Sequence, residues 1–165
     1  MANKLIVLSG VPGSGKSYFS QAFRSAKGNH VYIVSSDALR DLVTGYQQDM
    51  SQDKLVWKMF YGLATIYALD PDGTVILDAT NSICKYRTKI IEPFRKHFEE
   101  IDLVSFDLDK DIVRRQNLQR GFSLPPDVLE ELFIKFEGPN EIDEKFFDKV
   151  VVIKDHNIYP IIDSL

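Results

Sequence analysis

The stretch LIVLSGVPGSGKSYF, residues 5–19, runs from an apolar segment through a glycine-rich turn into a segment of helical period. Within it, Gly10, Gly15, Lys16 and Ser17 have the spacing G-x-x-x-x-G-K-S. Glycines allow the backbone to curl so that successive N–H groups point at phosphate oxygens, and the following helix adds its positive N-terminal end. A turn that only joins a strand to a helix needs no lysine at this position. The stretch therefore predicts a loop that binds the phosphates of a nucleotide.

Individual residues of this loop have expected roles. Lys16 is expected to reach the β- and γ-phosphates, and Ser17 to offer its hydroxyl to Mg²⁺. Tyr18 stands where many such loops carry a second small hydroxyl residue, so the α-phosphate must be held by backbone groups. The predicted nucleotide-binding residues of the loop are Gly10, Pro12, Gly13, Ser14, Gly15, Lys16, Ser17 and Tyr18. The predicted cofactors are ATP, or another nucleoside triphosphate, and Mg²⁺.

Length and composition narrow the class of protein. The chain has 165 residues, 44% of them apolar, which is enough for one compact domain spanning residues 1–165. A formal net charge of −4 argues against a protein that coats nucleic acid, so any contact with a polyanion is expected to be local. The single cysteine, Cys84, excludes an internal disulfide and fits a reducing compartment. No apolar stretch is long enough to span a membrane, and the expected location is the cytoplasm, or the host cytoplasm for a phage-encoded protein.

Short β-branched runs alternate with longer segments of helical period, which is typical of a parallel sheet covered by helices. The expected strands are Lys4–Leu8, Val31–Ser35, Thr74–Leu77, Ile101–Phe106 and Lys149–Ile153. The expected helices are Gly15–Arg24, Ser36–Thr44, Gln52–Leu69, Lys85–Phe98, Lys110–Arg120 and Asp127–Lys135. The pattern predicts an α/β fold with four or five parallel strands and helices on both faces.

Three further segments carry expectations of their own. In 52–69 a core-facing stripe is expected at Leu55, Met59, Leu63 and Ile66. Trp57, Phe60 and Tyr67 lie beside it, and they are expected to pack in the core, with stacking on a cofactor as the alternative. The polar segment 137–145 contains a glycine and a proline and is expected to be a surface connection. The apolar residues of 155–165 are expected to pack either on the core or on a second subunit.

In a parallel sheet the carboxyl ends of the strands meet at one edge, so residues that follow each strand converge on whatever the first loop binds. Asp37 and Arg40 follow the second expected strand and share one face of the first turn of a helix. The carboxylate is suited to accept the proton of an attacking hydroxyl, and the arginine to hold a phosphate of the acceptor. The alternative is that Ser36 or Asp37 only caps the helix.

The third expected strand leads to a second group of polar residues. Asp78 ends this strand. In nucleotide sites with a glycine-rich phosphate loop, an acid at the end of a strand helps to hold the water shell of Mg²⁺. The alternative is that Asp78 is purely structural. Thr80 and Asn81 follow, and either bind substrate or fix the turn. Ser17 and Asp78 are therefore the predicted metal-binding residues.

The segment 110–137 has the features of a helical flap. Arg114, Arg115 and Arg120 lie in a polar helix that ends at Gly121, and prolines stand near the start of the next helix. Two helices joined in this way can close over a nucleotide, with an arginine offsetting charge on the transferring phosphoryl group. Arg120, beside the helix end, is the predicted contact, and a solvated charged face is the alternative.

Taken together, GVPGSGKS, SSDALR, DATN, RRQNLQRG and LPPDVLEELFIKFEGPNEID make the chain similar to the polynucleotide 5′-hydroxyl kinases, the phage and bacterial end-healing kinases of the P-loop class. The resemblance covers nearly the whole chain. It implies a P-loop kinase fold with a helical lid, roughly residues 110–137. It also implies transfer of the γ-phosphate of a nucleoside triphosphate to the 5′-hydroxyl of DNA or RNA in nucleic-acid end repair.

The resemblance assigns roles residue by residue. Asp37 matches the general base, Arg40 the contact to the 3′-phosphate of the acceptor, and Arg120 the lid contact to the donor phosphates. One departure is that Ala79 separates Asp78 from Thr80. The predicted catalytic residues are Lys16, Asp37, Arg40 and Arg120, and the predicted substrate-binding residues are Asp37, Arg40, Thr80, Asn81 and Arg87.

The expected partners are single-stranded or end-frayed 5′-hydroxyl ends of DNA or RNA, and relatives in this family form homo-oligomers. Lys85, Arg87 and Lys89 are expected to form either a local basic patch for the nucleic-acid backbone or an ordinary exposed face. Two other functions remain open at this point. One is a kinase for a nucleoside, a small metabolite or hydroxymethyluracil in DNA, and the other is a module that binds ATP without transferring phosphate.

Overall fold

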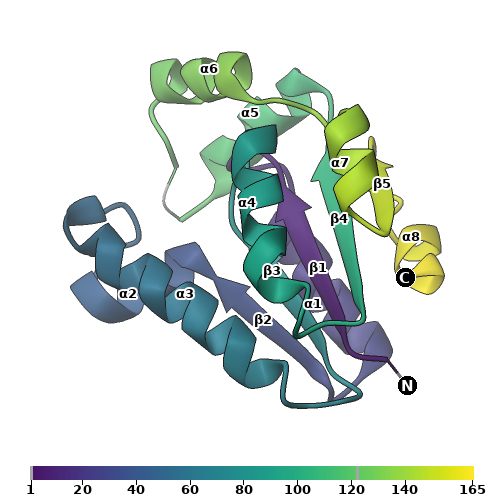
Figure 1. Ribbon diagram of the computed structural model, residues 1–165. Coiled ribbons are helices and arrows are strands. Elements are labelled where there is room, and N and C mark those ends of the chain that lie inside the picture. Colours follow the sequence, from purple (N-terminus) through teal and green to yellow (C-terminus); the bar gives the residue numbers. More distant parts are fainter. Residues whose placement is uncertain (1, 122) are drawn as a thin grey trace.

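The computed structural model describes residues 2–121 and 123–165, which form one parallel five-stranded sheet covered by helices on both faces (Figure 1). The strands are β1 (Lys4–Ser9), β2 (Val31–Ser35), β3 (Thr74–Asp78), β4 (Glu100–Phe106) and β5 (Lys149–Ile153). Their order across the sheet is β2-β3-β1-β4-β5, and every neighbouring pair is parallel. The predicted α/β fold is confirmed, with strand ends within one residue of those expected.

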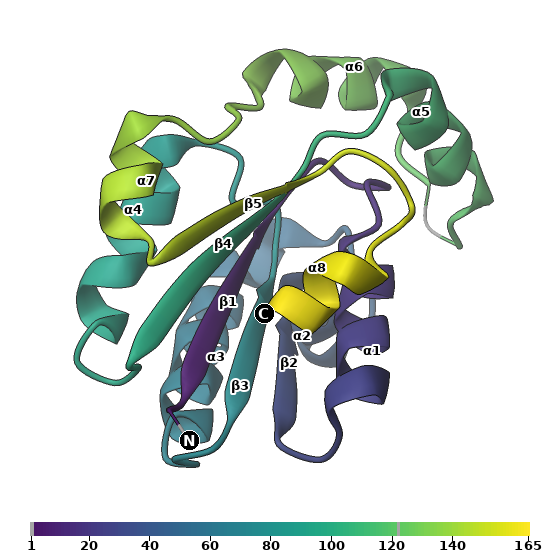
Figure 2. The same cartoon turned by 90° about the vertical axis from the view of Figure 1, so that its right-hand side faces the viewer.

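Helices follow the strands in alternation. They are α1 (Lys16–Lys27), α2 (Ser36–Thr44), the short 3₁₀ helix η1 (Met50–Gln52), α3 (Asp53–Tyr67), α4 (Cys84–Phe94), α5 (Lys110–Gln119), α6 (Pro126–Lys135), α7 (Glu141–Phe146) and α8 (Tyr159–Ser164). Figure 2 shows α3, α4 and α7 on one face of the sheet, α1 and α8 on the other, and α5 and α6 beyond the carboxyl ends of the strands. Among the described residues, no helix is long and apolar enough to cross a membrane.

The core has two halves, one on each face of the sheet. Because side chains alternate along a strand, Leu5 and Val7 of β1 face one half, and Ile6 and Leu8 face the other. All four are fully buried, as expected for a central strand of a parallel sheet. This packing fixes the carboxyl end of β1, where the glycine-rich loop begins.

The face that α3 presents to the core differs from the predicted one. Val56, Phe60 and Ala64 are fully buried, whereas Leu55 and Ile66 are largely exposed. The prediction that Leu55 and Ile66 belong to the core stripe is therefore wrong, although Met59 and Leu63 pack partly against the core. The cause is that 56, 60 and 64 form their own helical stripe, rotated by one residue from the predicted one.

The segment 137–145 is more than a surface connection. Asn140 and Asp143 form a capping box that starts α7, and the following Phe147 is buried in the core. The apolar residues of the C-terminal segment also pack on the core, since Ile158 and Ile162 are buried against the α1 side of the sheet.

Candidate active site

The glycine-rich loop connects β1 to α1 at the carboxyl edge of the sheet. Gly13 and Gly15 adopt φ values of +84° and +99°, which residues with a Cβ rarely adopt. Gly15 is the N-terminal cap of α1, so the first N–H groups of that helix open onto the loop. The Nζ of Lys16 donates hydrogen bonds to the carbonyl oxygens of Gly10 and Val11, at 2.8 and 3.1 Å. The local geometry is that of an anion-binding loop.

Ser17 and Asp78 meet beside this loop. The Ser17 hydroxyl donates to Oδ2 of Asp78 at 2.8 Å, which joins α1 to the end of β3. Burial lowers the pKa of the Lys16 ammonium, against the opposing attraction of Asp78. Burial also raises the pKa of Asp78, while Lys16 and the Ser17 hydroxyl oppose that rise. Burial therefore disfavours the charged form of both Lys16 and Asp78, and the opposite charge of the other residue favours it.

The donor atoms at this point suit Mg²⁺. A hydroxyl and a carboxylate are the oxygen ligands that this ion prefers, and it usually keeps several waters and binds substrate phosphates. No cluster of three or more His, Cys, Asp or Glu side chains that could hold a metal occurs within the described residues. Ser17 and Asp78 thus fit an ion that is held largely by water and phosphate, as predicted for a nucleotide-bound Mg²⁺.

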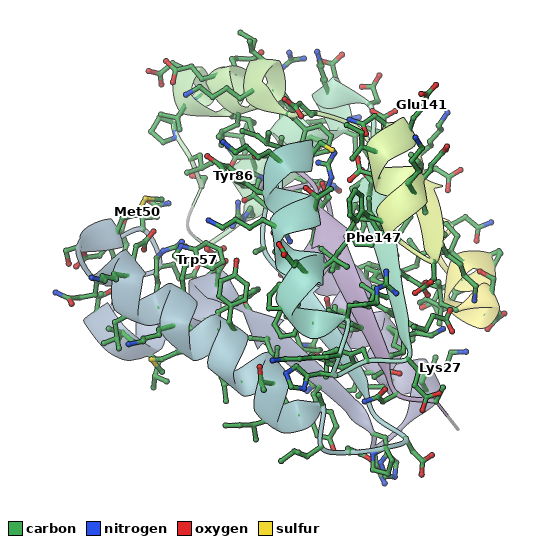
Figure 3. All side chains as sticks on the ribbon, in the orientation of Figure 1. Lys27, Met50, Trp57, Tyr86, Glu141 and Phe147 are labelled. Atoms are coloured by element: carbon green, nitrogen blue, oxygen red, sulfur yellow. The ribbon has the colours of Figure 1, made fainter. Side chains whose placement is uncertain are left out.

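Two cavities adjoin the loop. The loop cavity, about 530 Å³, is lined by residues that include Gly13, Gly15, Lys16, Ser17, Tyr18, Asp78, Gln116 and His156. The aromatic cavity, about 890 Å³, is lined by residues that include Arg40, Gln47, Gln48, Met50, Trp57, Tyr61, Asn81, Tyr86, Lys89, Leu124, Pro125 and Val128. Met50, Trp57 and Tyr86 are labelled in Figure 3 and come from η1, α3 and α4. Pro12, Ser36, Asp37, Thr80 and Arg120 line both cavities.

Asp37 therefore lies at the junction of the two cavities. Ser35 is the N-terminal cap of α2 and accepts a hydrogen bond from the N–H of Ala38. The N-terminal cap of this helix is thus Ser35, and neither Ser36 nor Asp37. The Asp37 side chain is 48% exposed, and its Oδ1 accepts a hydrogen bond from NH1 of Arg40 at 3.0 Å.

Arg120 approaches Asp37 from the other side of the junction. Its NH2 lies 3.8 Å from Oδ2 of Asp37. Its NH1 is buried and has no hydrogen-bond partner in the part of the chain that the structure describes. A buried arginine nitrogen without a partner is costly, and the residue also lines the loop cavity, where its positive charge suits an anionic ligand.

The α5–α6 segment is tied to the loop and to itself. Gln116 donates to the carbonyl oxygen of Gly13 at 3.0 Å. Buried Asn117 exchanges two hydrogen bonds with the backbone of Leu124, each 2.9 Å long. Arg114 pairs with Glu130 of α6, so this arginine belongs to the contact between the two helices.

Asn81 has a structural role that the sequence left open. It adopts a positive φ of 43°, its side chain donates to the carbonyl oxygen of Leu8 at 2.7 Å, and its own carbonyl oxygen accepts from Ser9. The carbonyl oxygen of Thr80 accepts from the N–H of Gly10 at 2.9 Å. These bonds fix the turn after β3 against the glycine-rich loop, while both side chains still border the aromatic cavity.

Arg87 is not part of an exposed basic patch, and that prediction is wrong. Its side chain is fully buried and pairs with Asp143, which is also fully buried, at 2.8 Å. The guanidinium also donates to the carbonyl oxygens of Asn81 and Glu137. Of the three predicted basic residues, only Lys89 lines the aromatic cavity. The sequence could not reveal this burial, because Asp143 lies far along the chain.

The reasoning from sequence also missed the aromatic lining of the larger cavity. Trp57, Tyr61 and Tyr86 were not placed in the site, although the aromatic residues of α3 were visible in the sequence. Without the orientation of α3 and α4, these residues could not be separated from core residues. Asp53, which contacts Arg40, was missed as well.

A glycine-rich phosphate loop on a parallel sheet, an adjoining acidic strand end and a helical segment over the loop define a P-loop kinase fold. The chain belongs to the family described as AAA domain, with a match over residues 5–139.

The curated proteins that are similar to this chain include a yeast and an archaeal protein. Protein kti12 of Schizosaccharomyces pombe is 26% identical over 148 residues, covering 82% of this chain and 52% of that protein. L-seryl-tRNA(Sec) kinase of Methanococcus maripaludis is 24% identical over 142 residues, covering 82% of this chain and 53% of that protein. The chain thus spans about half the length of these relatives.

Solved structures share the fold. A protein of Chloroflexus aurantiacus, named for a proposed kinase activity, has a TM-score of 0.76 at 16% identity, covering 99% of this chain and 97% of its own. The Pnkp1/Rnl/Hen1 RNA repair complex contains a chain with a TM-score of 0.69 at 22% identity, covering 89% of this chain and 47% of its own. A fungal RNA kinase has a TM-score of 0.66 at 21% identity, covering 95% of this chain and 40% of its own.

Proposed function

We propose that the protein is an ATP-dependent kinase that phosphorylates the 5′-hydroxyl end of DNA or RNA. The observation that carries the proposal is the position of Asp37, at the junction of the loop cavity and the aromatic cavity. A carboxylate at such a junction is suited to act on a hydroxyl that enters from one side and a phosphoryl group that enters from the other.

In this proposal the triphosphate binds in the loop cavity. Backbone N–H groups of the loop and of the start of α1 hold the phosphates, and Lys16 exchanges its carbonyl partners for the β- and γ-phosphates. Ser17 and Asp78 would hold Mg²⁺, which when bound offsets charge on the phosphates. Arg120, which lines the same cavity, would bind a phosphoryl oxygen through its guanidinium.

The transfer step follows from this arrangement. The oxygen of the acceptor hydroxyl forms a bond to the γ-phosphorus, and the bond between that phosphorus and the β–γ bridging oxygen breaks. The proton of the hydroxyl passes to the Asp37 carboxylate, and ADP leaves with the bridging oxygen. Lys16 and Arg120 offset the negative charge on the transferring group.

The aromatic cavity supports a nucleic-acid acceptor. Trp57, Tyr61 and Tyr86 are among its lining residues, and unstacked bases bind on aromatic side chains with little dependence on sequence. Lys89 adds a positive charge, and it makes no ion pair with any other described residue. A fungal RNA kinase of similar fold is named for action on RNA, and L-seryl-tRNA(Sec) kinase, which is similar in sequence, is named for action on an aminoacyl-tRNA.

The test is transfer of radiolabelled γ-phosphate to a set of matched acceptors. These are a DNA and an RNA oligonucleotide with 5′-hydroxyl ends, the same strands with 5′-phosphate ends, free nucleosides, and duplex DNA containing hydroxymethyluracil. We expect label only on the 5′-hydroxyl strands, and none with Lys16→Ala. Labelling of nucleosides alone, or of hydroxymethyluracil alone, would replace the proposal with the corresponding kinase.

A matched pair of lysines tests the acceptor side. Lys89→Ala should raise the KM for the oligonucleotide several-fold and leave the KM for ATP unchanged, because it removes one ionic contact to a phosphate of the nucleic-acid backbone. Lys85 is exposed on the same helix but outside the cavity, so Lys85→Ala is the control. Equal effects of the two substitutions would contradict the placement of the strand.

A further inference from the structure

The guanidinium of Arg40 is held on three sides. Its Nε donates to Oδ1 of Asp53 at 2.7 Å, and its NH2 lies 3.4 Å from Oδ2 of the same carboxylate. Its NH1 donates to Oδ1 of Asp37 at 3.0 Å. Its central carbon lies 5.9 Å from the centre of the Trp57 ring, within range of a cation–π contact. The side chain is only 8% exposed.

These contacts limit what Arg40 can do for a substrate. A planar guanidinium that is paired through one edge to a carboxylate and lies over an aromatic ring is held in one orientation. In that orientation it reaches only one oxygen of Asp37, Oδ1, and leaves Oδ2 without a hydrogen bond from Arg40. Oδ2 is the oxygen that Arg120 approaches across the junction of the cavities.

We infer that Asp53 is a positioning residue for phosphoryl transfer. It holds Arg40 so that Arg40 fixes the Asp37 carboxylate through Oδ1, and Oδ2 is the atom that accepts the proton of the acceptor hydroxyl. The inference rests on the proposed function, in which Asp37 is the base. It gives Arg40 the role of holding Asp37 in place of the contact with the acceptor phosphate that the family resemblance implies, because its Nε, NH1 and NH2 each already bind Asp53 or Asp37.

The loss of Asp53 has a definite expected consequence. Arg40 would be free to turn its two-nitrogen edge toward Asp37 and bind both carboxylate oxygens, as arginine–carboxylate pairs commonly do. Oδ2 would then be engaged and shifted from its position at the junction. Misplacement of a reacting group by about 1 Å can cost roughly 100-fold in rate.

Asp53 also has an ordinary structural role, which the test must distinguish from its positioning role. It is the first residue of α3, where an acidic side chain favours the helix dipole. A role in the helix dipole alone would lower thermal stability by the same amount whether or not Arg40 is present. A positioning role acts through Arg40 and disappears when Arg40 is absent.

The test is a double-mutant cycle measured with a 5′-hydroxyl oligonucleotide. We expect Asp53→Ala to lower kcat roughly 10- to 100-fold with the KM for ATP unchanged. In the background of Arg40→Ala, the same substitution should have no further effect on kcat. Asp53→Glu should recover part of the rate, since it restores the carboxylate. Asp41→Asn, an exposed aspartate beside Arg40 on α2, is the charge-matched control and should match the wild type.

Two kinetic results would overturn the inference. One is a loss of kcat from Asp53→Ala that is equally large with and without Arg40. The other is an Arg40→Ala variant with normal kcat and a raised KM only for acceptors that carry a 3′-phosphate, which would make Arg40 a phosphate ligand.

Fluorescence gives a readout that needs no activity. Trp57 is the single tryptophan of the chain, and Arg40 lies over its ring. If Asp53 holds Arg40 there, Asp53→Ala and Arg40→Ala should shift the emission of Trp57 alike, and the double variant should add nothing. Should the wild type phosphorylate no acceptor hydroxyl, the proposed function would fail while this measurement still decides whether Asp53 holds Arg40. An unchanged spectrum in an active enzyme would overturn the inference alone.

Discussion

The buried ion pair between Arg87 of α4 and Asp143 of α7 should be one of the most sensitive points of the fold. Nε and NH2 of Arg87 bind the two carboxylate oxygens of Asp143 at 2.9 and 2.8 Å. NH1 donates to the carbonyl oxygens of Asn81 and Glu137 at 3.0 and 2.8 Å. Both side chains are fully buried. Arg87→Ala would therefore leave the buried Asp143 carboxylate without its counter-charge and remove the arginine donor from the carbonyl oxygen of Glu137.

The magnitude follows from the burial. Removing one partner of a buried ion pair typically costs about 3–5 kcal/mol, because the remaining charge keeps its desolvation penalty. For a chain of this length, 1 kcal/mol shifts Tm by about 2–4 °C. Arg87→Ala is thus expected to lower Tm by roughly 6–20 °C. Replacing both residues, as in Arg87→Met with Asp143→Leu, should recover much of the loss, because two apolar side chains leave no unpaired charge.

The assay is thermal and urea unfolding followed by circular dichroism. Arg95→Ala is the matched control, because Arg95 pairs with Asp148 at 2.7 Å but both side chains are more than 40% exposed. An exposed pair is worth about 0–1 kcal/mol, so this variant should unfold close to the wild type. The reasoning is refuted if Arg87→Ala is no less stable than Arg95→Ala. It is also refuted if Arg87→Ala keeps full stability and loses only the binding of oligonucleotide.

Three further substitutions have defined outcomes. Burial raises the pKa of Asp102 to about 6, so the stability of the wild type should fall as the pH rises from about 4 to 6 and this carboxyl group ionises in the folded protein. Asp102→Asn should therefore stabilise the protein by about 1–3 kcal/mol above pH 6 and have no such effect below pH 4. Unfolding curves with the same pH dependence in both proteins would contradict this cause. Gly15→Ala should cost about 1–2 kcal/mol in stability, because residues with a Cβ rarely adopt the φ of +99° found there. The added methyl group would have no described atom within 4 Å, so the cost comes from the backbone alone. The strained loop should also raise the KM for ATP. A normal KM would exclude Gly15 from the phosphate site. Asn117→Ala should speed hydrogen exchange at the amide of Leu124, whose bond it removes, and unchanged exchange would show that the α5–α6 connection is held elsewhere.

Much of the fold could be predicted because its signals are local. Strands such as β2 and β5 are short β-branched runs, and their ends match the predicted ends. The glycine-rich loop could be predicted from spacing alone, because the positive φ values at Gly13 and Gly15 require glycine, and the lysine that follows is visible in the sequence. The same holds for the arrangement of Asp37 and Asp78 at one edge of the sheet, which follows from parallel strands.

The errors concern features that depend on distant partners. Arg87 looks like any exposed helical arginine until Asp143 is brought beside it by α7. The helix α7 itself is short and highly charged, although Asn140 and Asp143 have the spacing of a capping box and could have predicted it. The core face of α3 was wrong by one position, because several apolar stripes exist on that helix and only packing against the sheet selects Val56, Phe60 and Ala64.

The role of Asp37 is tested most directly by single-turnover transfer from labelled ATP to a 5′-hydroxyl oligonucleotide, comparing the wild type with Asp37→Asn. If Asp37 accepts the proton of the hydroxyl, the substitution should slow transfer by about 10²- to 10⁴-fold while the Kd for ATP and the Tm stay close to the wild-type values. Transfer at the wild-type rate by Asp37→Asn would contradict the assignment of the base and, with it, the mechanism.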